Sequence, residues 1–294
     1  MAVIFDWQDS WPLRIHLKRI RMKRIIAGLA LGAAATLVTV APAQAAPVNP
    51  VKAVNKQFSP GHGVRISETN RTFKDGKAGI ITRITGSLEF GESGVVASDL
   101  SKRFKPAKGM DKSEAKLFAT LGPTRILSLG GYSYAQGGVY GTNLPEDRKW
   151  VRFPAESGSG VSQMIDIFDA KLLKTLVAKA KHVKGDYRGA ISLKELAGLT
   201  SGEKVDGHLA KIQVKYLLDT DSRGLVSRVV SEWTMDFGVL GTSKSVTESR
   251  FTGWGAKIKI KAPPESQWVD FEDLDADALQ DMPENSIDLL GQNR

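Results

Sequence analysis

The stretch from residue 208 to 237 has the hydrophobic pattern of two long strands joined by one turn. Its first half places apolar side chains at every second position, namely Ile212, Val214, Tyr216 and Leu218. A cluster of turn-forming residues follows at 219–224, and the second half continues with Leu225, Val229, Trp233, Met235 and Phe237. A period of two is typical of a strand with one buried face and one solvated face. The pattern therefore predicts a hairpin whose apolar face needs a cover.

Similar alternation recurs along most of the chain between residues 64 and 261. It predicts further strands at 64–73, 80–90, 95–104, 117–121, 126–134, 150–153, 182–193, 245–251 and 258–261. Short turns rich in Gly, Pro and Asp separate these segments, and Pro263 and Pro264 end the pattern. Strands at this spacing, joined by such short turns, are typical of an antiparallel sheet and not of βαβ units.

Helical spacing appears in only a few places. Asn49 and Pro50 form a helix start, because Asn caps a helix and Pro fits its first turn. An amphipathic helix is predicted at 172–180, where the apolar side chains are Leu172, Leu173, Leu176, Val177 and Ala180. Residues 194–199 read as a short helix or turn. The helix at 172–180 is expected to lay its apolar side on the sheet.

The predicted helices are too small to cover the predicted sheet. Eleven strands at a spacing of about 4.8 Å span roughly 50 Å, whereas a helix of a dozen residues is about 18 Å long. Either the sheet curls tightly and its own side chains fill it, or a ligand or partner occupies the remaining space. Both alternatives are open at this point.

The amino terminus has the pattern of an export signal. Met22, Lys23 and Arg24 precede an uncharged apolar run at 25–40, and small residues up to Ala45 follow it. This predicts a cleaved signal peptide over 1–45, with translation starting at Met22, and an exported protein on the extracellular side of the cell envelope. An uncleaved amino-terminal anchor is the alternative.

Charge divides the remainder of the chain. Residues 46–264 hold 34 basic and 21 acidic side chains, whereas residues 265–294 hold one and nine. We therefore predict one folded domain over 46–264 and a flexible acidic tail over 265–294.

Catalytic and metal-binding patterns are weak. The chain has no cysteine, which excludes disulfides, thiolate ligands and a lipid anchor on cysteine. The histidines are scattered, and Ser113 and Lys116 match the S-x-x-K motif without its partner motifs. Asp219 and Asp221 resemble the start of a calcium loop, but Val230 stands where the terminal glutamate is required. We therefore predict no enzyme, no catalytic residue, no metal and no cofactor.

The basic body does not indicate nucleic-acid binding, because few aromatic residues lie between its lysines and the chain is predicted to be exported. Anionic lipid headgroups or the cell wall fit the charge better. The candidates for this contact lie on the outer side of the helix at 172–180, namely Lys171, Lys174 and Lys179. A solvated helix face is the alternative.

The whole pattern resembles a known family. The chain resembles the actinobacterial LppX and LprG lipoproteins, which are relatives in fold of the carrier LolA. The resemblance is carried by the signal, the hairpin with its Asp-rich turn, Tyr134, the strand at 150–152 and the closing block at 251–264. The resemblance covers roughly residues 48–270 and implies a mostly β half-barrel of about eleven antiparallel strands, lidded by short helices over a cavity for acyl chains. Those relatives keep a lipobox cysteine, which this chain lacks, so tethering by lipid is excluded.

We therefore predict a monomeric, non-enzymatic protein that holds a lipid or another amphiphile in an apolar cavity. The residues predicted to line that cavity are Ile84, Leu88, Phe90, Leu172, Leu176, Val177, Ile212, Val214, Tyr216, Val229, Trp233 and Met235. An envelope protein-interaction or sensing domain is the alternative function, with an envelope protein as its partner, and a hydrolase is a more distant one. A slip of one residue in strand register would turn these side chains outward.

Overall fold

The structure is a computed structural model that describes residues 48–141, 144–155, 160–183 and 185–274. The predicted signal peptide, the start at Met22 and most of the acidic tail lie outside these residues, so those predictions stay predictions.

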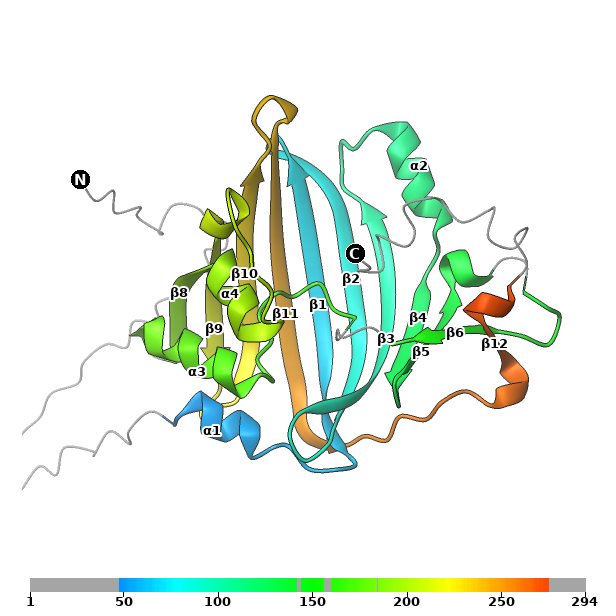
Figure 1. The fold of residues 1–294 in the computed structure, drawn as a ribbon, viewed down its shortest axis with the longest axis horizontal. Coiled ribbons are helices and arrows are strands. Elements are labelled where there is room, and N and C mark those ends of the chain that lie inside the picture. Colours follow the sequence, from blue (N-terminus) through cyan, green and yellow to red (C-terminus); the bar gives the residue numbers. More distant parts are fainter. Residues whose placement is uncertain (1–47, 142–143, 156–159, 184, 275–294) are drawn as a thin grey trace, which may run out of the picture. The chain divides into compact units, whose positions relative to one another are not determined.

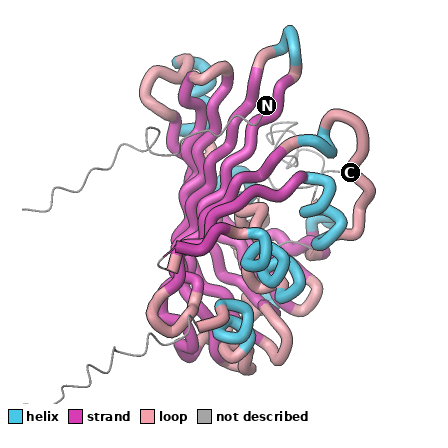
Figure 2. Tube along the Cα trace, turned by 90° about the vertical axis from the view of Figure 1, so that its left-hand side faces the viewer, coloured by secondary structure: helices cyan, strands magenta, loops and turns pink. Residues whose placement is uncertain are grey.

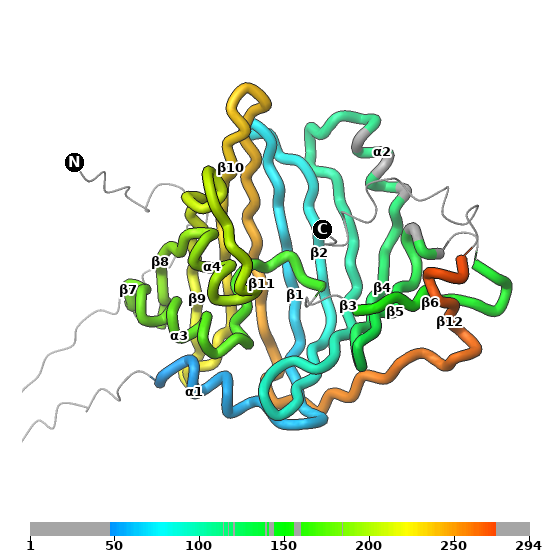
Figure 3. Tube along the Cα trace, viewed as in Figure 1, coloured from blue at the N-terminus to red at the C-terminus, as the bar shows by residue number. Residues whose placement is uncertain are grey.

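The described residues form one open curved sheet of twelve strands (Figures 1 and 3). In chain order the strands are β1 (His62–Lys74), β2 (Lys77–Phe90), β3 (Val95–Pro106), β4 (Thr124–Leu129), β5 (Tyr132–Gly137), β6 (Trp150–Pro154), β7 (Lys181–Val183), β8 (Asp186–Ser192), β9 (Gln213–Thr220), β10 (Val226–Asp236), β11 (Thr242–Lys257) and β12 (Trp268–Asp270). Their order across the sheet is β12-β6-β5-β4-β3-β2-β1-β11-β10-β9-β8-β7. The predicted fold class, mostly β with a curved sheet and a few helices, is confirmed.

The sheet is mixed, which differs from the fully antiparallel sheet that we predicted. All described neighbours are antiparallel except β12, which pairs parallel to β6. Figure 2 shows the long strands from the side as one twisted layer. Both edges of the sheet are three-residue strands, β7 and β12.

The helices are short, and several start where the sequence places a capping residue. They are α1 (Pro50–Asn55), α2 (Lys112–Thr120), α3 (Ala170–Lys179) and α4 (Leu193–Thr200), with 3-10 turns η1 (Gly138–Gly141), η2 (Leu209–Lys211), η3 (Gly238–Leu240), η4 (Glu265–Gln267) and η5 (Phe271–Asp273). Asn49 caps α1, because its side-chain oxygen accepts the N–H of Val51 at 3.0 Å. The helices predicted to start at Asn49–Pro50 and at 172–180 are therefore confirmed, and the first of them, α1, ends at Asn55.

The strand predicted at 117–121 is wrong, since these residues belong largely to α2. Lys112–Thr120 is rich in the helix formers Lys, Glu, Ala and Leu. The Asp111 carboxylate accepts the N–H of Ser113 at 2.8 Å, which satisfies a backbone group at the start of the helix. Local helix propensity therefore outweighs a short apolar run that is compatible with either structure.

The strand predicted at 258–261 is also wrong, and the sheet does not end at Pro264. β11 ends at Lys257, after Gly253 and Gly255 have taken positive φ angles of 64° and 77°. The backbone N–H of Ile260 then donates to the Glu89 carboxylate at 2.6 Å. The chain returns to the sheet as β12, where the Arg152 guanidinium pairs with Asp270 and lies 3.8 Å from the Trp268 ring centroid.

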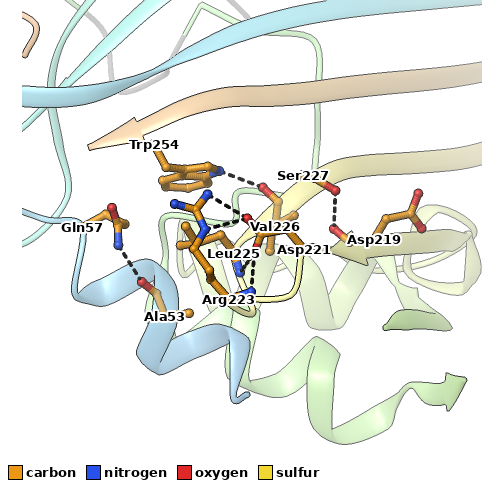
Figure 4. Close-up of polar contacts among 9 residues, drawn as sticks. All are labelled: Ala53, Gln57, Asp219, Asp221, Arg223, Leu225, Val226, Ser227 and Trp254. Atoms are coloured by element: carbon orange, nitrogen blue, oxygen red, sulfur yellow. Dashed lines mark hydrogen bonds and ion pairs between the residues drawn. The ribbon is translucent and has the colours of Figure 1, made fainter. Parts of the chain in front are cut away.

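The predicted hairpin is formed by β9 and β10, and its turn has the conformation that the Asp and Gly residues favour (Figure 4). The Asp221 carboxylate accepts the N–H groups of Arg223 and Leu225, both at 2.9 Å, and its second oxygen pairs with the Arg223 guanidinium. Gly224 adopts a φ of 78°. The Trp254 indole N–H donates to the Val226 carbonyl at 3.0 Å and so ties β11 to the end of this turn. These contacts describe a hairpin turn, as we predicted in preference to a calcium loop.

The main core lies between the sheet and the helices α1, α3 and α4, which lie in front of one half of the sheet (Figure 1). We call this side of the sheet the inner face. Leu172, Leu173 and Leu176 of α3 are fully buried. The Tyr216 hydroxyl of β9 donates to the Leu176 carbonyl at 2.8 Å, so the sheet adds a second hydrogen bond to an oxygen that also accepts the Ala180 N–H.

We expect Leu176→Ala to lower the free energy of unfolding by about 2–5 kcal/mol, because the substitution removes a fully buried side chain and leaves a cavity. Urea denaturation measures this change. Lys174→Ala, on the exposed side of the same helix, serves as the control and should change stability little. Equal effects of the two substitutions would contradict the packing described above.

Candidate functional site

The residues predicted to line a ligand cavity lie on the inner face and on α3, as expected from strand parity. Most are buried, namely Ile84, Leu88, Phe90, Leu172, Leu176, Ile212, Val214, Tyr216 and Val229. Val177, Trp233 and Met235 are partly exposed. All but Ile212 and Met235 pack in one hydrophobic cluster with other residues of the chain. In this half of the inner face the protein's own side chains provide the packing, and ligand binding by these residues stays a prediction.

An irregular segment supplies the cover that the helices do not. Residues 160–169, which we call the crossing segment, run over the central strands toward α3 (Figure 1). Ile165 and Ile167 are each 1% exposed and belong to the main cluster. The crossing segment therefore closes the core between α3 and the middle of the sheet.

The crossing segment is fixed by polar side chains of β1 and β11. The Glu68 carboxylate, which is 1% exposed, accepts the N–H of Ser162 at 2.6 Å and the hydroxyl of Ser249 at 2.8 Å. The Gln163 amide donates to the Ser249 hydroxyl at 3.3 Å. Two residues farther along β1, the Asn70 amide donates to the hydroxyls of Ser245 and Thr247 at 2.7 and 2.8 Å. A row of hydrogen-bonded polar groups thus divides an otherwise apolar inner face.

Burial governs the charges in this row. It raises the pKa of the Glu68 carboxyl above its usual value, against the lowering effects of the Ser162 and Ser249 hydrogen bonds and of the Lys102 charge. Burial likewise lowers the pKa of Lys102 on β3, and the Glu68 charge opposes this. The two groups therefore stabilise each other's charged form in a site that disfavours charge.

We expect the stability of the wild-type chain relative to Glu68→Gln to fall as pH rises through the region above 4.5. The folded chain binds a proton at Glu68 more readily than the unfolded chain does, so the contribution of this carboxyl to the free energy of unfolding decreases while the proton is lost. Urea denaturation over a pH series measures the difference between the two chains. A difference that stays constant, or that grows with pH, would show that Glu68 is not held in a charge-disfavouring environment.

A cavity of about 420 Å³ lies beside the crossing segment, where the turns at one end of the sheet meet the start of α3. Its lining consists of Gly94, Val95, Val96, Ala97, Ser98, Ser128, Leu129, Gly130, Gly131, Ala155, Asp166, Phe168 and Asp169. The volume is within the range of small-molecule sites in proteins. None of the side chains predicted to line a cavity contributes to it.

Tight turns of the sheet form one side of this cavity. Gly130 and Gly131 join β4 to β5 with φ angles of 61° and 80°, a pair that two-residue hairpin turns require. The N–H of Ala155 donates to the Gly131 carbonyl at 2.9 Å. At the start of β3 the register shifts, which leaves Val96 unpaired with β2 and 57% exposed. The bulge therefore presents the Val96 side chain to the cavity, and this side chain is not part of the core.

The crossing segment supplies the opposite wall and both acidic groups of the lining. The Phe168 ring contacts Phe90, Phe251 and Trp254 at centroid distances of 5.8, 5.6 and 5.9 Å, so it separates the cavity from the main core. The Asp169 carboxylate accepts the N–H of Leu172 at 2.8 Å and caps α3. Asp166 is exposed and accepts the N–H of Phe168 at 2.8 Å. Apolar and carboxylate groups thus face one space, an arrangement that suits an amphiphile.

Sequence reasoning did not find this cavity. Its signals were the apolar cluster at 164–168 and the glycine turns at 91–94 and 130–131, but nothing in the sequence shows that these segments meet. Glu68 and Asn70 were missed as well, although they occupy positions of β1 where the alternation of Val64 and Ile66 calls for apolar residues.

The lysines predicted to contact lipid headgroups, Lys171, Lys174 and Lys179, are exposed on α3. Lys179 forms an ion pair with Glu195 of α4 at 2.5 Å, so part of its charge is compensated. Their contact with a membrane stays a prediction.

Two kinds of feature are absent from the residues that the structure describes. No helix among these residues is long and apolar enough to span a membrane. No group of three His, Asp or Glu side chains within the same ranges is placed to hold a metal ion.

Comparisons with known proteins establish no family for this chain. No family matches the sequence, and no curated protein matches it. Solved structures with some likeness include a LolA superfamily protein from Nitrosomonas europaea, with 10% identity, coverage of 74% of this chain and 94% of that one, and a TM-score of 0.27. A DUF1329 family protein from Desulfovibrio piger has 11% identity, coverage of 73% and 96%, and a TM-score of 0.27. Scores this low carry no argument about fold or function, so the likeness to LppX and LprG stays a resemblance.

Proposed function

We propose that the protein is an exported, non-enzymatic binding protein that holds a lipid or another amphiphile in the cavity between the crossing segment and the sheet. The observation that supports this most directly is the 420 Å³ cavity, whose lining combines apolar side chains with two carboxylates. Binding of this kind requires only burial and a few polar contacts.

The apolar part of the ligand would lie against Val95, Val96, Leu129 and Phe168. Each methylene removed from water there contributes about 0.8 kcal/mol, so even a short alkyl chain can bind measurably. This places the ligand beside the main core, and not within the region under α3 that we first predicted.

The polar part would face Asp166, Asp169, Ser98 and Ser128. Carboxylates accept hydrogen bonds and attract cations, so this lining favours an ammonium or a hydroxyl-rich headgroup over a carboxylate or a phosphate. The proposed ligand class is therefore an amphiphile with a cationic or neutral, hydrogen-bond-donating headgroup.

Export is supported by the basic, apolar and small-residue pattern of residues 22–45. Mass determination of the protein recovered from outside the cytoplasm should give a chain that begins at residue 46. A chain that retains residues 25–40 would favour the anchor instead.

We expect the chain from residue 46 onward to bind dodecylamine more tightly than dodecanoic acid, and Val96→Lys to weaken dodecylamine binding. The change replaces an aliphatic side chain of the lining with a positive charge that repels the ammonium headgroup, so a loss of about tenfold in affinity is expected. Calorimetric titration, together with native mass spectrometry of the chain as isolated, measures this.

Val183→Lys is the matched control, because Val183 is likewise exposed (50%) but lies on β7 and not in the cavity lining. Equal affinity of Val96→Lys and the wild-type chain would exclude this cavity as the site. A wild-type chain that binds neither probe but isolates with a protein partner would favour the sensing alternative.

A further inference from the structure

The tip of the β10–β11 hairpin exposes a group of apolar side chains. Phe237 is 51% exposed, Leu240 is 77% exposed, and Val239 is fully exposed. The hairpin projects beyond the ends of the neighbouring strands (Figure 1). Large apolar side chains grouped at a projecting tip contribute nothing to the core, and such exposed groups commonly mark an interaction site.

The backbone of this tip is well held. The N–H of Phe237 donates to the Gly241 carbonyl at 2.9 Å, and the N–H of Gly238 donates to the Asp236 carboxylate at 2.8 Å. At the base, the Asp75 carboxylate of the β1–β2 turn accepts the N–H of Thr242 at 2.7 Å. These bonds fix η3 in a conformation that keeps its apolar side chains in solvent.

Cationic side chains surround the base of the tip. Lys74 and Lys77 are exposed and lie opposite each other in the register of β1 and β2, beside the turn that joins these strands. Lys74 also lies opposite Ser243 in the register of β1 and β11. Arg71 is exposed farther along β1, where it pairs with Val246 of β11. Among the nearby acidic groups, Asp75 and Asp236 accept backbone N–H groups and Glu232 pairs with Lys244 at 3.0 Å. The end of the sheet therefore combines an apolar tip with exposed lysine side chains.

We propose that this hairpin tip, residues 237–240, inserts into the surface of an anionic lipid bilayer, while Lys74 and Lys77 contact the headgroups. Insertion buries Phe237, Val239 and Leu240 in the acyl region, and the lysines gain from the negative surface potential. Charge complementarity selects a bilayer as the occupant, because the apolar group is small and the cations lie around it.

This membrane contact differs from the headgroup contact that the sequence predicts through the lysines of α3. The outer side of α3 offers Lys171 and Lys174 without an apolar side chain at a projecting tip, and Lys179 is paired there. The inference does not depend on the proposed amphiphile cavity, which has its own lining residues and its own binding assay.

The test uses the chain from residue 46 onward, which contains all the described helices and strands. Because the chain has no cysteine, Val239→Cys and Val183→Cys can each carry one environment-sensitive fluorophore. With vesicles of equal parts phosphatidylglycerol and phosphatidylcholine, we expect a blue shift of the label at position 239 and none at 183. Pure phosphatidylcholine vesicles should give a much smaller shift.

Vesicle sedimentation of unlabelled variants supplies a second measurement. Combining Val239→Asp with Leu240→Asp should lower the partition coefficient by about tenfold or more, since two charges replace the inserting side chains. Lys74→Glu with Lys77→Glu should abolish most of the preference for phosphatidylglycerol. Thermal unfolding of both variants should match the wild type, because the substituted side chains are exposed.

Several results would overturn the proposal. They are the absence of any shift at position 239, an equal or larger shift at position 183, and unchanged sedimentation of the Val239→Asp, Leu240→Asp variant. A larger shift at position 183 would transfer the contact to the α3 side of the protein.

Discussion

The requirement to satisfy backbone hydrogen bonds over a buried sheet face governs this structure. The helices cover only part of the inner face, and an irregular chain segment closes the core between α3 and the middle of the sheet. Irregular backbone can lie in a core only if its N–H and C=O groups find partners. The Glu68 carboxylate accepts the N–H of Ser162, and the Gln163 side-chain oxygen accepts the N–H of Ile165. The polar side chains on the inner face thus bond the backbone of the crossing segment, and this allows the segment to complete the core.

The strand pattern was largely predictable from the sequence, for a definite reason. In β9 the apolar parity is uninterrupted, and β10 resumes it after a register shift at 226–228. The turn residues Asp221 and Gly224 have specific conformational preferences, so the hairpin follows from local information. The segment at 112–120 was misassigned because a short apolar run suits both a strand and a helix, and only its helix formers and Asp111 decide between them. β12 could not be foreseen, since this three-residue strand pairs parallel with the distant strand β6, whose Arg152 contacts both Asp270 and the Trp268 ring.

The site was less predictable than the fold. Parity correctly placed side chains such as Leu88 and Val214 on the inner face, but parity cannot show whether the space in front of a face is filled. That depends on where residues 160–169 run, and their contacts with β1 and β11 join positions more than eighty residues apart. A carboxylate at an inward position, as at Glu68, was the available signal that some backbone group approaches the sheet there.

The two edges of the sheet have a consequence for the protein in concentrated solution. The long strands β1, β2, β10 and β11 all lie inside the sheet, where both of their sides are paired. At the outer margins stand only β7, which carries Lys181, and β12, whose Asp270 pairs with Arg152. Short, charged margins offer little template for strand addition by another molecule. Both margins of this wide sheet are therefore poor sites for strand addition, although the sheet does not close into a ring.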